Sequence, residues 1–84
     1  MKILYSPKFV RQYKKLSNQI KDKVEEREDI LRANPFDNRL KTHKLNGDLR
    51  DYWSFSIDYK IRIIFVLRDA NTISLEFIGD HNIY

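Results

Sequence analysis

The chain has 84 residues and no cysteine, and 42% of its residues are apolar and 13% aromatic. This composition predicts one domain over residues 1–84 with a single core, and it excludes a disordered chain, a disulfide framework and a thiolate metal site. No apolar run approaches the ~20 residues of a membrane span, and the apolar start of the chain is too short for a secretion signal. We therefore expect a cytoplasmic protein with no membrane association.

The positive charge is concentrated in the first part of the chain. The formal net charge is +4 and the isoelectric point is about 9.4. Residues 1–33 carry nine Lys or Arg against five acids, whereas residues 34–84 carry seven of each. A basic surface of this kind favours a polyanion or an acidic protein as partner, and a solubilising helix surface explains it equally well.

The first part of the chain predicts a short strand at residues 3–5 and then two helices. The first helix begins at Ser6-Pro7 and the second at Ser17-Asn18, because Ser is a good N-cap and Pro is tolerated in the first turn. The second helix ends before Asn34-Pro35. Apolar residues recur at helical spacing in both segments: Phe9, Tyr13, Leu16, Ile20, Val24 and then Ile30 or Leu31. These segments predict two antiparallel helices.

The second part of the chain predicts a loop and three strands. Residues 35–48 form a long polar connection with a turn at Asn46-Gly47. Strands follow at residues 49–57, 61–67 and 72–78, and the middle one is apolar on both faces, as is typical of a central strand. The order β-α-α-β-β-β predicts an α+β fold in which a helical hairpin packs on one face of an antiparallel sheet.

Three residues of this sequence could form a metal-free site for RNA cleavage. The only two histidines are His43, in the predicted loop, and His81, in the tail after the last strand, and Arg62 lies between them. Two imidazoles beside an arginine would supply an acid, a base and a cationic stabiliser. The plainer interpretations are two solvated histidines and an ion pair between Arg62 and Asp58. With no Gly-rich phosphate loop and no carboxylate cluster, we expect neither a metal nor a cofactor.

Four segments, taken in order, resemble a known family: residues 43–47 (HKLNG), 51–54 (DYWS), 61–65 (IRIIF) and 78–84 (IGDHNIY). Together with the order of elements, they resemble the RelE/ParE superfamily of bacterial type II toxin–antitoxin toxins, and most of all its YoeB and YafQ branches. The resemblance covers the whole chain. It implies a RelE-like fold and a ribosome-dependent mRNA endonuclease that inhibits translation without a metal ion.

The resemblance implies a catalytic role for four residues. His43 falls where YafQ-like toxins place a catalytic histidine and YoeB a glutamate base, and Arg62 matches the catalytic arginine of RelE and YoeB. His81 matches the histidine near the C-terminus of YoeB and YafQ, and Tyr84 matches the closing aromatic residue. His43 would then be the base, His81 the acid and Arg62 the stabiliser of charge on the phosphate. Neighbouring residues would make further contacts with the substrate. Lys41, Lys44 and Arg50 would contact phosphates, and Tyr52 would stack on a nucleobase.

The chain departs from the family in and after the strand that precedes Arg62. Trp53 stands near the place of a further YafQ histidine and is expected in the core, and Asp58 approximates a YafQ aspartate. RelE's lysines are absent from this strand. Two residues separate His81 from Tyr84, whereas the corresponding residues of YoeB are adjacent.

The resemblance also implies partners. These are an acidic antitoxin, the ribosomal A site with its mRNA, and operator DNA contacted only through the antitoxin. Two alternatives stay open: a ParE-like toxin that inhibits DNA gyrase without cutting RNA, and an inactive member that only binds its antitoxin.

Overall fold

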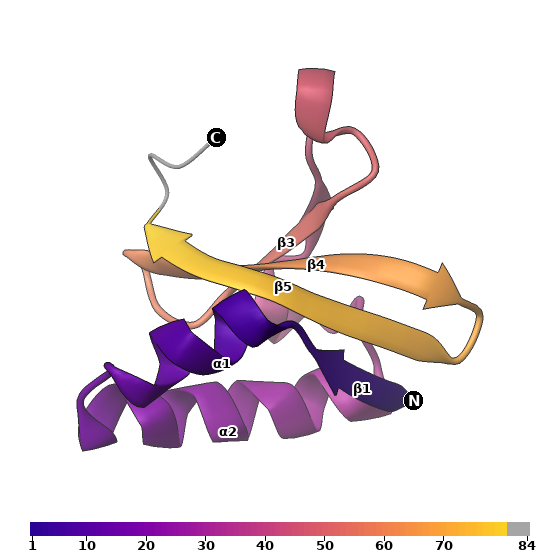
Figure 1. Ribbon diagram of the computed structural model, residues 1–84. Helices are drawn as coiled ribbons and strands as arrows, with labels where there is room; N and C mark the ends of the chain where they lie inside the picture. Colours follow the sequence, from indigo (N-terminus) through magenta and orange to yellow (C-terminus); the bar gives the residue numbers. More distant parts are fainter. Residues whose placement is uncertain (81–84) are drawn as a thin grey trace.

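The computed structural model describes residues 1–80, and it confirms the α+β prediction. Two helices lie on one side of a five-stranded sheet with the order β1-β5-β4-β3-β2 (Figure 1). Two 3₁₀ turns, η1 (Asn38–Leu40) and η2 (Gly47–Leu49), flank β2. The helices and strands are β1 (Lys2–Tyr5), α1 (Pro7–Lys14), α2 (Asn18–Ala33), β2 (His43–Lys44), β3 (Trp53–Ser56), β4 (Ile61–Asp69) and β5 (Thr72–Asp80).

Both helices begin at the predicted serines. The Ser6 Oγ accepts the N–H of Phe9 at 2.9 Å, and the Ser17 Oγ accepts the N–H of Ile20 at 3.2 Å. Each such cap stabilises a helix by about 1 kcal/mol. α2 ends where Asn34 becomes extended, because the residue before a proline disfavours the helical conformation. Within residues 1–80, neither helix has the length and apolar character needed to cross a bilayer.

The first strand makes the sheet mixed, which corrects the prediction of a purely antiparallel sheet. β1 pairs with β5 in parallel, with Lys2 opposite Thr72 and Tyr5 opposite Leu75, whereas the other neighbouring strands pair antiparallel. The direction of a four-residue edge strand is not encoded in its apolar pattern. Tertiary structure sets it here, because α1 must start at the end of β1 and continue along the same edge of β5.

Two further predictions are corrected between residues 35 and 57. The predicted loop contains η1 and the two-residue strand β2, and the strand predicted at 49–57 is shortened to β3. The N–H of Leu49 donates to the carbonyl of Asn46 (3.3 Å), and the N–H of Tyr52 donates to that of Leu49 (2.9 Å). Gly47, with φ +65°, supplies the left-handed conformation that this turn requires. A strand of two residues is too short to show alternation.

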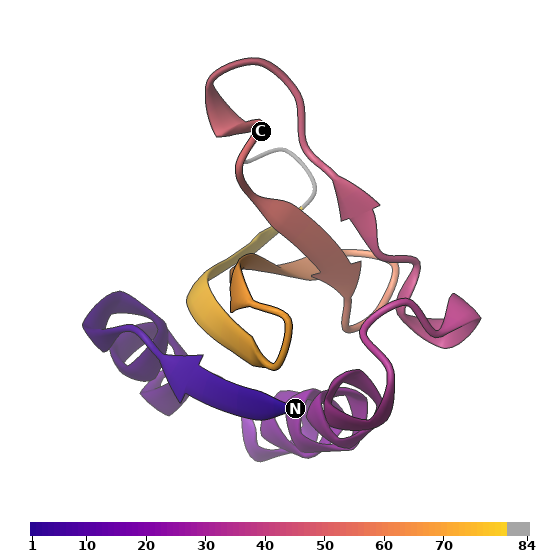
Figure 2. The same ribbon diagram turned by 90° about the vertical axis from the view of Figure 1, so that its right-hand side faces the viewer.

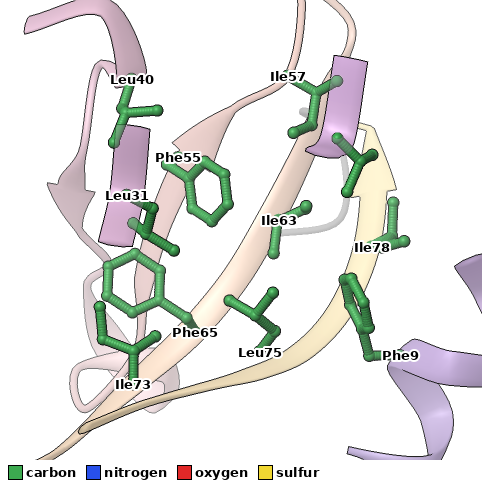
Figure 3. Close-up of a cluster of buried hydrophobic side chains, with 11 residues drawn as sticks. Phe9, Leu31, Leu40, Phe55, Ile57, Ile63, Phe65, Ile73, Leu75 and Ile78 are labelled. Carbon is green, nitrogen blue, oxygen red and sulfur yellow. The ribbon is translucent and has the colours of Figure 1, made fainter. Parts of the chain in front are cut away.

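The core lies between the sheet and the helices (Figure 3). Alternate residues of β3, β4 and β5 face it, as the period of two requires, and Phe9 and Leu31 pack on it from the helices. Each fully buried side chain of this size contributes about 1.5–3 kcal/mol. Ile63 and Ile64 are neighbours on opposite faces of β4, and both are fully buried. β4 is therefore the covered central strand that its sequence predicts.

Helix α1 and its N-cap cover the part of the β5 edge that does not pair with β1. The N–H of Ser6 donates to the carbonyl of Leu75 (2.9 Å), and the Ser6 hydroxyl donates to that of Glu76 (2.5 Å). One turn further on, the Gln12 Oε1 accepts the N–H of Ile78 at 2.6 Å. Side chains of α1 thus satisfy backbone groups of a strand edge that would otherwise need water or another strand.

We expect Gln12→Ala to lower the free energy of unfolding by about 1–3 kcal/mol, because the N–H of Ile78 loses its acceptor in a partly buried place. Gln19→Ala is the matched control, since Gln19 is exposed in the first turn of α2. Urea denaturation of both variants measures the difference. Equal stability of the two variants would mean that water replaces the Gln12 amide at no cost.

Candidate active site

The face of the sheet that points away from the helices carries two of the four residues predicted to be catalytic, His43 and Arg62. We call it the site face; in Figure 2, β2 and β3 lie above the two helices. Directly opposed residues of antiparallel strands share a face. One row of opposed residues crosses four strands: His43, Ser54, Ile64 and Phe77. The next row contains Ser56, Arg62 and Gly79. His43 and Arg62 therefore belong to the same face.

His43 and Arg62 are separated by two strand spacings across the sheet and two residues along it. With about 4.8 Å between strands and about 3.3 Å per residue, their Cα atoms lie about 12 Å apart. The β3 residues between them, Ser54 and Ser56, are small and buried. No large side chain of β3 therefore stands between His43 and Arg62, and other parts of the protein cover the two serines.

The backbone around His43 is fixed on both sides. Before it, Leu40 is fully buried, Lys41 adopts a left-handed conformation with φ 52°, and the Thr42 hydroxyl donates to the carbonyl of Pro35 at 2.6 Å. After it, Leu45 is buried and its N–H donates to the carbonyl of Tyr52 at 3.0 Å. A non-glycine residue with positive φ is uncommon. Here it turns the chain out of η1 so that β2 can join the sheet with an exposed His43.

The tautomer of His43 follows from its neighbour. The Nδ1 atom lies 3.2 Å from the carbonyl oxygen of Lys41. A carbonyl oxygen only accepts, so this contact selects the tautomer in which Nδ1 carries the hydrogen. The lone pair of the neutral ring then lies on Nε2, which is the atom that can take a proton from a substrate. This arrangement suits a general base.

The guanidinium of Arg62 lies toward the β3–β4 turn. Its Nη1 donates to the carbonyl of Asp58 at 2.6 Å and to that of Ile61 at 3.3 Å. The Asp58 carboxylate instead accepts the N–H groups of Ile61 and Lys60 at 2.7 and 2.8 Å, and these hydrogen bonds lower its pKa. Asp58 therefore fixes the turn, and Arg62 donates to neutral carbonyl groups, while the nearby Asp58 carboxylate interacts with its charge without a direct hydrogen bond.

His43 and Arg62 line two different hollows. His43 lines one of about 420 Å³ with residues of the η2 segment, whereas Arg62 lines one of about 230 Å³ at the β3–β4 turn. The structure thus brings the two side chains to one face without joining them in one pocket. Within residues 1–80, no three His, Asp or Glu side chains gather as a metal site would require.

The other predicted residues do not gather at one place in the structure. Tyr52 lies on it, with its ring 6.5 Å from that of Phe77. Trp53 packs against the core, as expected, and its ring stacks with that of Phe65. The Lys44 Nζ lies 6.0 Å from the Trp53 ring centroid, toward the opposite face. Two more predicted contacts, Lys41 and Arg50, are exposed. His81 and Tyr84 lie outside the described residues.

Sequence reasoning missed Phe77 as a residue of the site face. Counting alternate residues from Ile73 and Leu75 places Phe77 in the core, but β5 has an irregularity at this point. Phe65 pairs with Leu75, whereas Ile64 pairs with Phe77, so one residue of β5 has no counterpart on β4 and the alternation shifts. Lys8 of α1 lies over the Phe77 ring, with its Nζ 4.9 Å from the centroid. A bulge of this kind has no strong local sequence signal.

Known proteins show which fold this is. No family model and no curated protein matches the chain. Among solved structures, a YoeB/ParE toxin from Agrobacterium tumefaciens superposes with a TM-score of 0.81 at 19% identity, covering 96% of this chain and 99% of that chain. YafQ from E. coli strain BL21(DE3) gives 0.77 at 22% identity, with 94% and 91% covered. The YoeB dimer from Staphylococcus aureus gives 0.78 at 24% identity, with 96% and 97% covered.

Two of these toxins have also been solved with partners, as the E. coli DinJ-YafQ toxin-antitoxin complex and the S. aureus YoeB-YefM complex. The similarity extends over almost the whole of each chain, while the sequence identities stay below 25%. The chain has the fold of the YoeB and YafQ toxins, which confirms, at the level of the fold, the RelE/ParE resemblance of its sequence.

Proposed function

We propose that the chain is the toxin of a type II toxin–antitoxin pair and that it cleaves mRNA on the ribosome without a metal ion of its own. The observation that carries this proposal is the strand register. It assigns His43 and Arg62 to the same face of the sheet, with two small buried serines between them, on a fold shared with the YoeB and YafQ toxins. An imidazole and a guanidinium on either side of a phosphate are the groups that RNA transesterification needs.

The proposed reaction transfers the scissile phosphoryl group to the neighbouring ribose 2′-OH. The Nε2 atom of His43 takes the 2′-OH proton, and the 2′ oxygen attacks the phosphorus. The bond from phosphorus to the 5′ oxygen of the next nucleotide breaks, and His81 protonates that oxygen. The products are a 2′,3′-cyclic phosphate and a 5′-OH. In this mechanism His43 starts neutral, as a base must, and His81 starts protonated, as an acid must.

Arg62 stabilises the negative charge that develops on the phosphate oxygens. Its bonds to two carbonyls fix the guanidinium, so little reorganisation is needed when the charge develops. Arg50 and Lys41 are further cations that could contact phosphates of the RNA. The rings of Tyr52 and Phe77 offer an aromatic surface on which a nucleobase could stack. Tyr84 closes the site in this proposal.

The proposed partner is an acidic antitoxin. The sequence of α1, PKFVRQYK, has no acidic residue, and its cations Lys8, Arg11 and Lys14 are exposed. A partner of opposite charge is attracted by such a helix before it docks. The toxin–antitoxin complexes of YafQ and YoeB support a partner of this type. Operator DNA would be contacted only through the antitoxin.

Association with the antitoxin is expected to slow as salt rises, because the Debye length falls from about 30 Å at 0.01 M to about 10 Å at 0.1 M. Stopped-flow mixing of toxin and antitoxin over this range measures the rate constant. Lys14→Gln should reduce the salt dependence, and Gln19→Ala serves as the uncharged control. Association rates that ignore ionic strength would instead indicate an interface dominated by apolar contacts.

The proposed function is tested by expressing the chain without antitoxin and mapping mRNA 5′ ends in the arrested cells. We expect new ends within translated reading frames, and their loss when translation is blocked beforehand. Arrest with intact mRNA and inhibited gyrase would favour the ParE-like alternative. If the folded protein causes neither growth arrest nor cleavage, the chain is better explained as an inactive member that only binds its antitoxin.

A further inference from the structure

A small hollow lies at the end of the sheet, beside the turn that joins β3 to β4. Its volume is about 230 Å³, and we call it the turn hollow. Four cations from three segments line it: Arg27 of α2, Arg39 and Lys41 in and just after η1, and Arg62 of β4. Because these three segments are far apart in sequence, only the folded chain forms this concentration of positive charge.

The cations that line the turn hollow outnumber the acids beside them. Asp58 is the acid in the lining, and its carboxylate accepts two backbone N–H groups of the turn. Arg39 pairs with Asp37 at 3.0 Å, and Glu26 also lies near it. The close ion pairs among residues 1–80 involve Arg32, Arg39 and Arg68. Arg27 and Arg62 interact with Asp37 and Asp58 only at longer range. The half-buried Arg27 donates to the carbonyl of Arg39 at 2.8 Å.

The turn hollow also carries an aromatic ring that the fold does not bury. Tyr59 lines it and is 88% exposed, the highest value among the large exposed hydrophobic residues of the described chain. Exposing a ring of this size forgoes the free energy that burial would give. A ring beside a basic hollow is the arrangement with which proteins bind single-stranded RNA, where bases stack on aromatics and phosphates meet cations.

The turn hollow adjoins the proposed cleavage site at two points. Arg62 belongs to both, and the carbonyl of Lys41 contacts the Nδ1 of His43. An RNA strand held between His43 and Arg62 would therefore continue over the hollow. We propose that the turn hollow binds one nucleotide of the substrate RNA beside the cleaved bond, with its phosphate on Arg27, Lys41 and Arg62 and its base on Tyr59. This inference rests on the proposed function.

The size and chemistry of the hollow favour a nucleotide over an acidic peptide. With about 30 Å³ for each water, 230 Å³ holds a phosphate together with several waters. The fork of an arginine matches phosphate geometry, and three arginines line the hollow. A carboxylate side chain would use the cations but leave Tyr59 uncovered.

The test is binding of the full chain to a short single-stranded RNA of mixed sequence whose riboses are 2′-O-methylated, which prevents cleavage. Fluorescence anisotropy is measured over a range of salt concentrations. We expect Tyr59→Ala to weaken binding at least about fivefold with an unchanged salt dependence, because one stacked base is lost. Tyr59→Phe should bind as the native chain does. Arg27→Gln with Lys41→Gln should reduce the slope of log K against log salt by about 0.7 for each phosphate that the variant no longer neutralises.

Lys15→Gln is the matched charge control, since Lys15 is exposed and follows α1, away from the hollow. Melting curves for all variants confirm that they fold. The proposal is overturned if the hollow variants bind like Lys15→Gln, if the native chain shows no binding at low salt, or if the variants weaken only the binding of antitoxin. Native RNA binding that depends on the hollow, without cleavage on ribosomes, would keep this inference and refute the nuclease.

Discussion

His43→Ala is expected to lower the single-turnover rate of mRNA cleavage on programmed ribosomes by about 10²–10⁴-fold, the usual effect of removing one positioned proton-transfer group. The side chain is exposed, and the backbone around it is held by Leu40, Thr42 and Leu45. The variant should therefore melt as the native protein does and still bind antitoxin. A matched control is Asn46→Ala, because the Asn46 side chain is exposed and makes no capping hydrogen bond.

His81→Ala should lower the rate to a similar extent, and the double variant should lose less than the product of the two factors if the histidines act as a unit. Near-native cleavage by a folded His43→Ala protein would remove His43 from the mechanism. The same result for His81→Ala would move the role of proton donor to Tyr84 or Arg62.

Arg62→Ala is expected to lower the cleavage rate by about 10²–10³-fold, because it removes a preorganised donor for the charge on the phosphate. Arg62→Lys should recover only part of the loss, since an ammonium keeps the charge but lacks the planar fork. Arg68→Ala is the matched control: Arg68 lies on the same strand and forms a long ion pair with Glu76 at 3.8 Å. Single-turnover kinetics with saturating ribosomes separates this effect from weaker binding.

Arg62 also holds the β3–β4 turn through the carbonyl of Asp58, so its removal has a structural cost. Urea denaturation of Arg62→Ala measures that cost, and kinetics should be run well below the melting temperature. If folded Arg62→Ala cleaves mRNA as fast as Arg68→Ala does, Arg62 has only a structural role in the β3–β4 turn.

The parts of the fold that local chemistry determines could be predicted from the sequence. Ser6-Pro7 and Ser17 specify the helix starts because capping involves residues three apart. The covered central strand at 61–67 follows from its apolar residues on both faces. The parallel direction of β1 and the existence of β2 could not be predicted, because strand direction and pairing depend on residues far away in sequence.

The candidate residues of the site could be proposed from the sequence, but their arrangement could not. The two histidines and Arg62 stand out because they are few and match a familiar order. The bulge in β5 that brings Phe77 to the site face, and the bonds that direct the Arg62 guanidinium toward the turn, depend on tertiary contacts. The turn hollow could not be predicted for the same reason, because Arg27 is one of several charged residues on α2 and Tyr59 is one residue of a turn.

Chemical identification of the RNA ends produced on programmed ribosomes tests the nuclease proposal most directly. A reaction in which the 2′ oxygen attacks the phosphorus leaves a 2′,3′-cyclic phosphate, or the monophosphate formed from it, on the upstream fragment and a 5′-OH on the downstream fragment. The proposed roles of His43, Arg62 and His81 require these ends. A 3′-OH with a 5′-phosphate would show that water or a metal-bound hydroxide is the nucleophile and would contradict the mechanism.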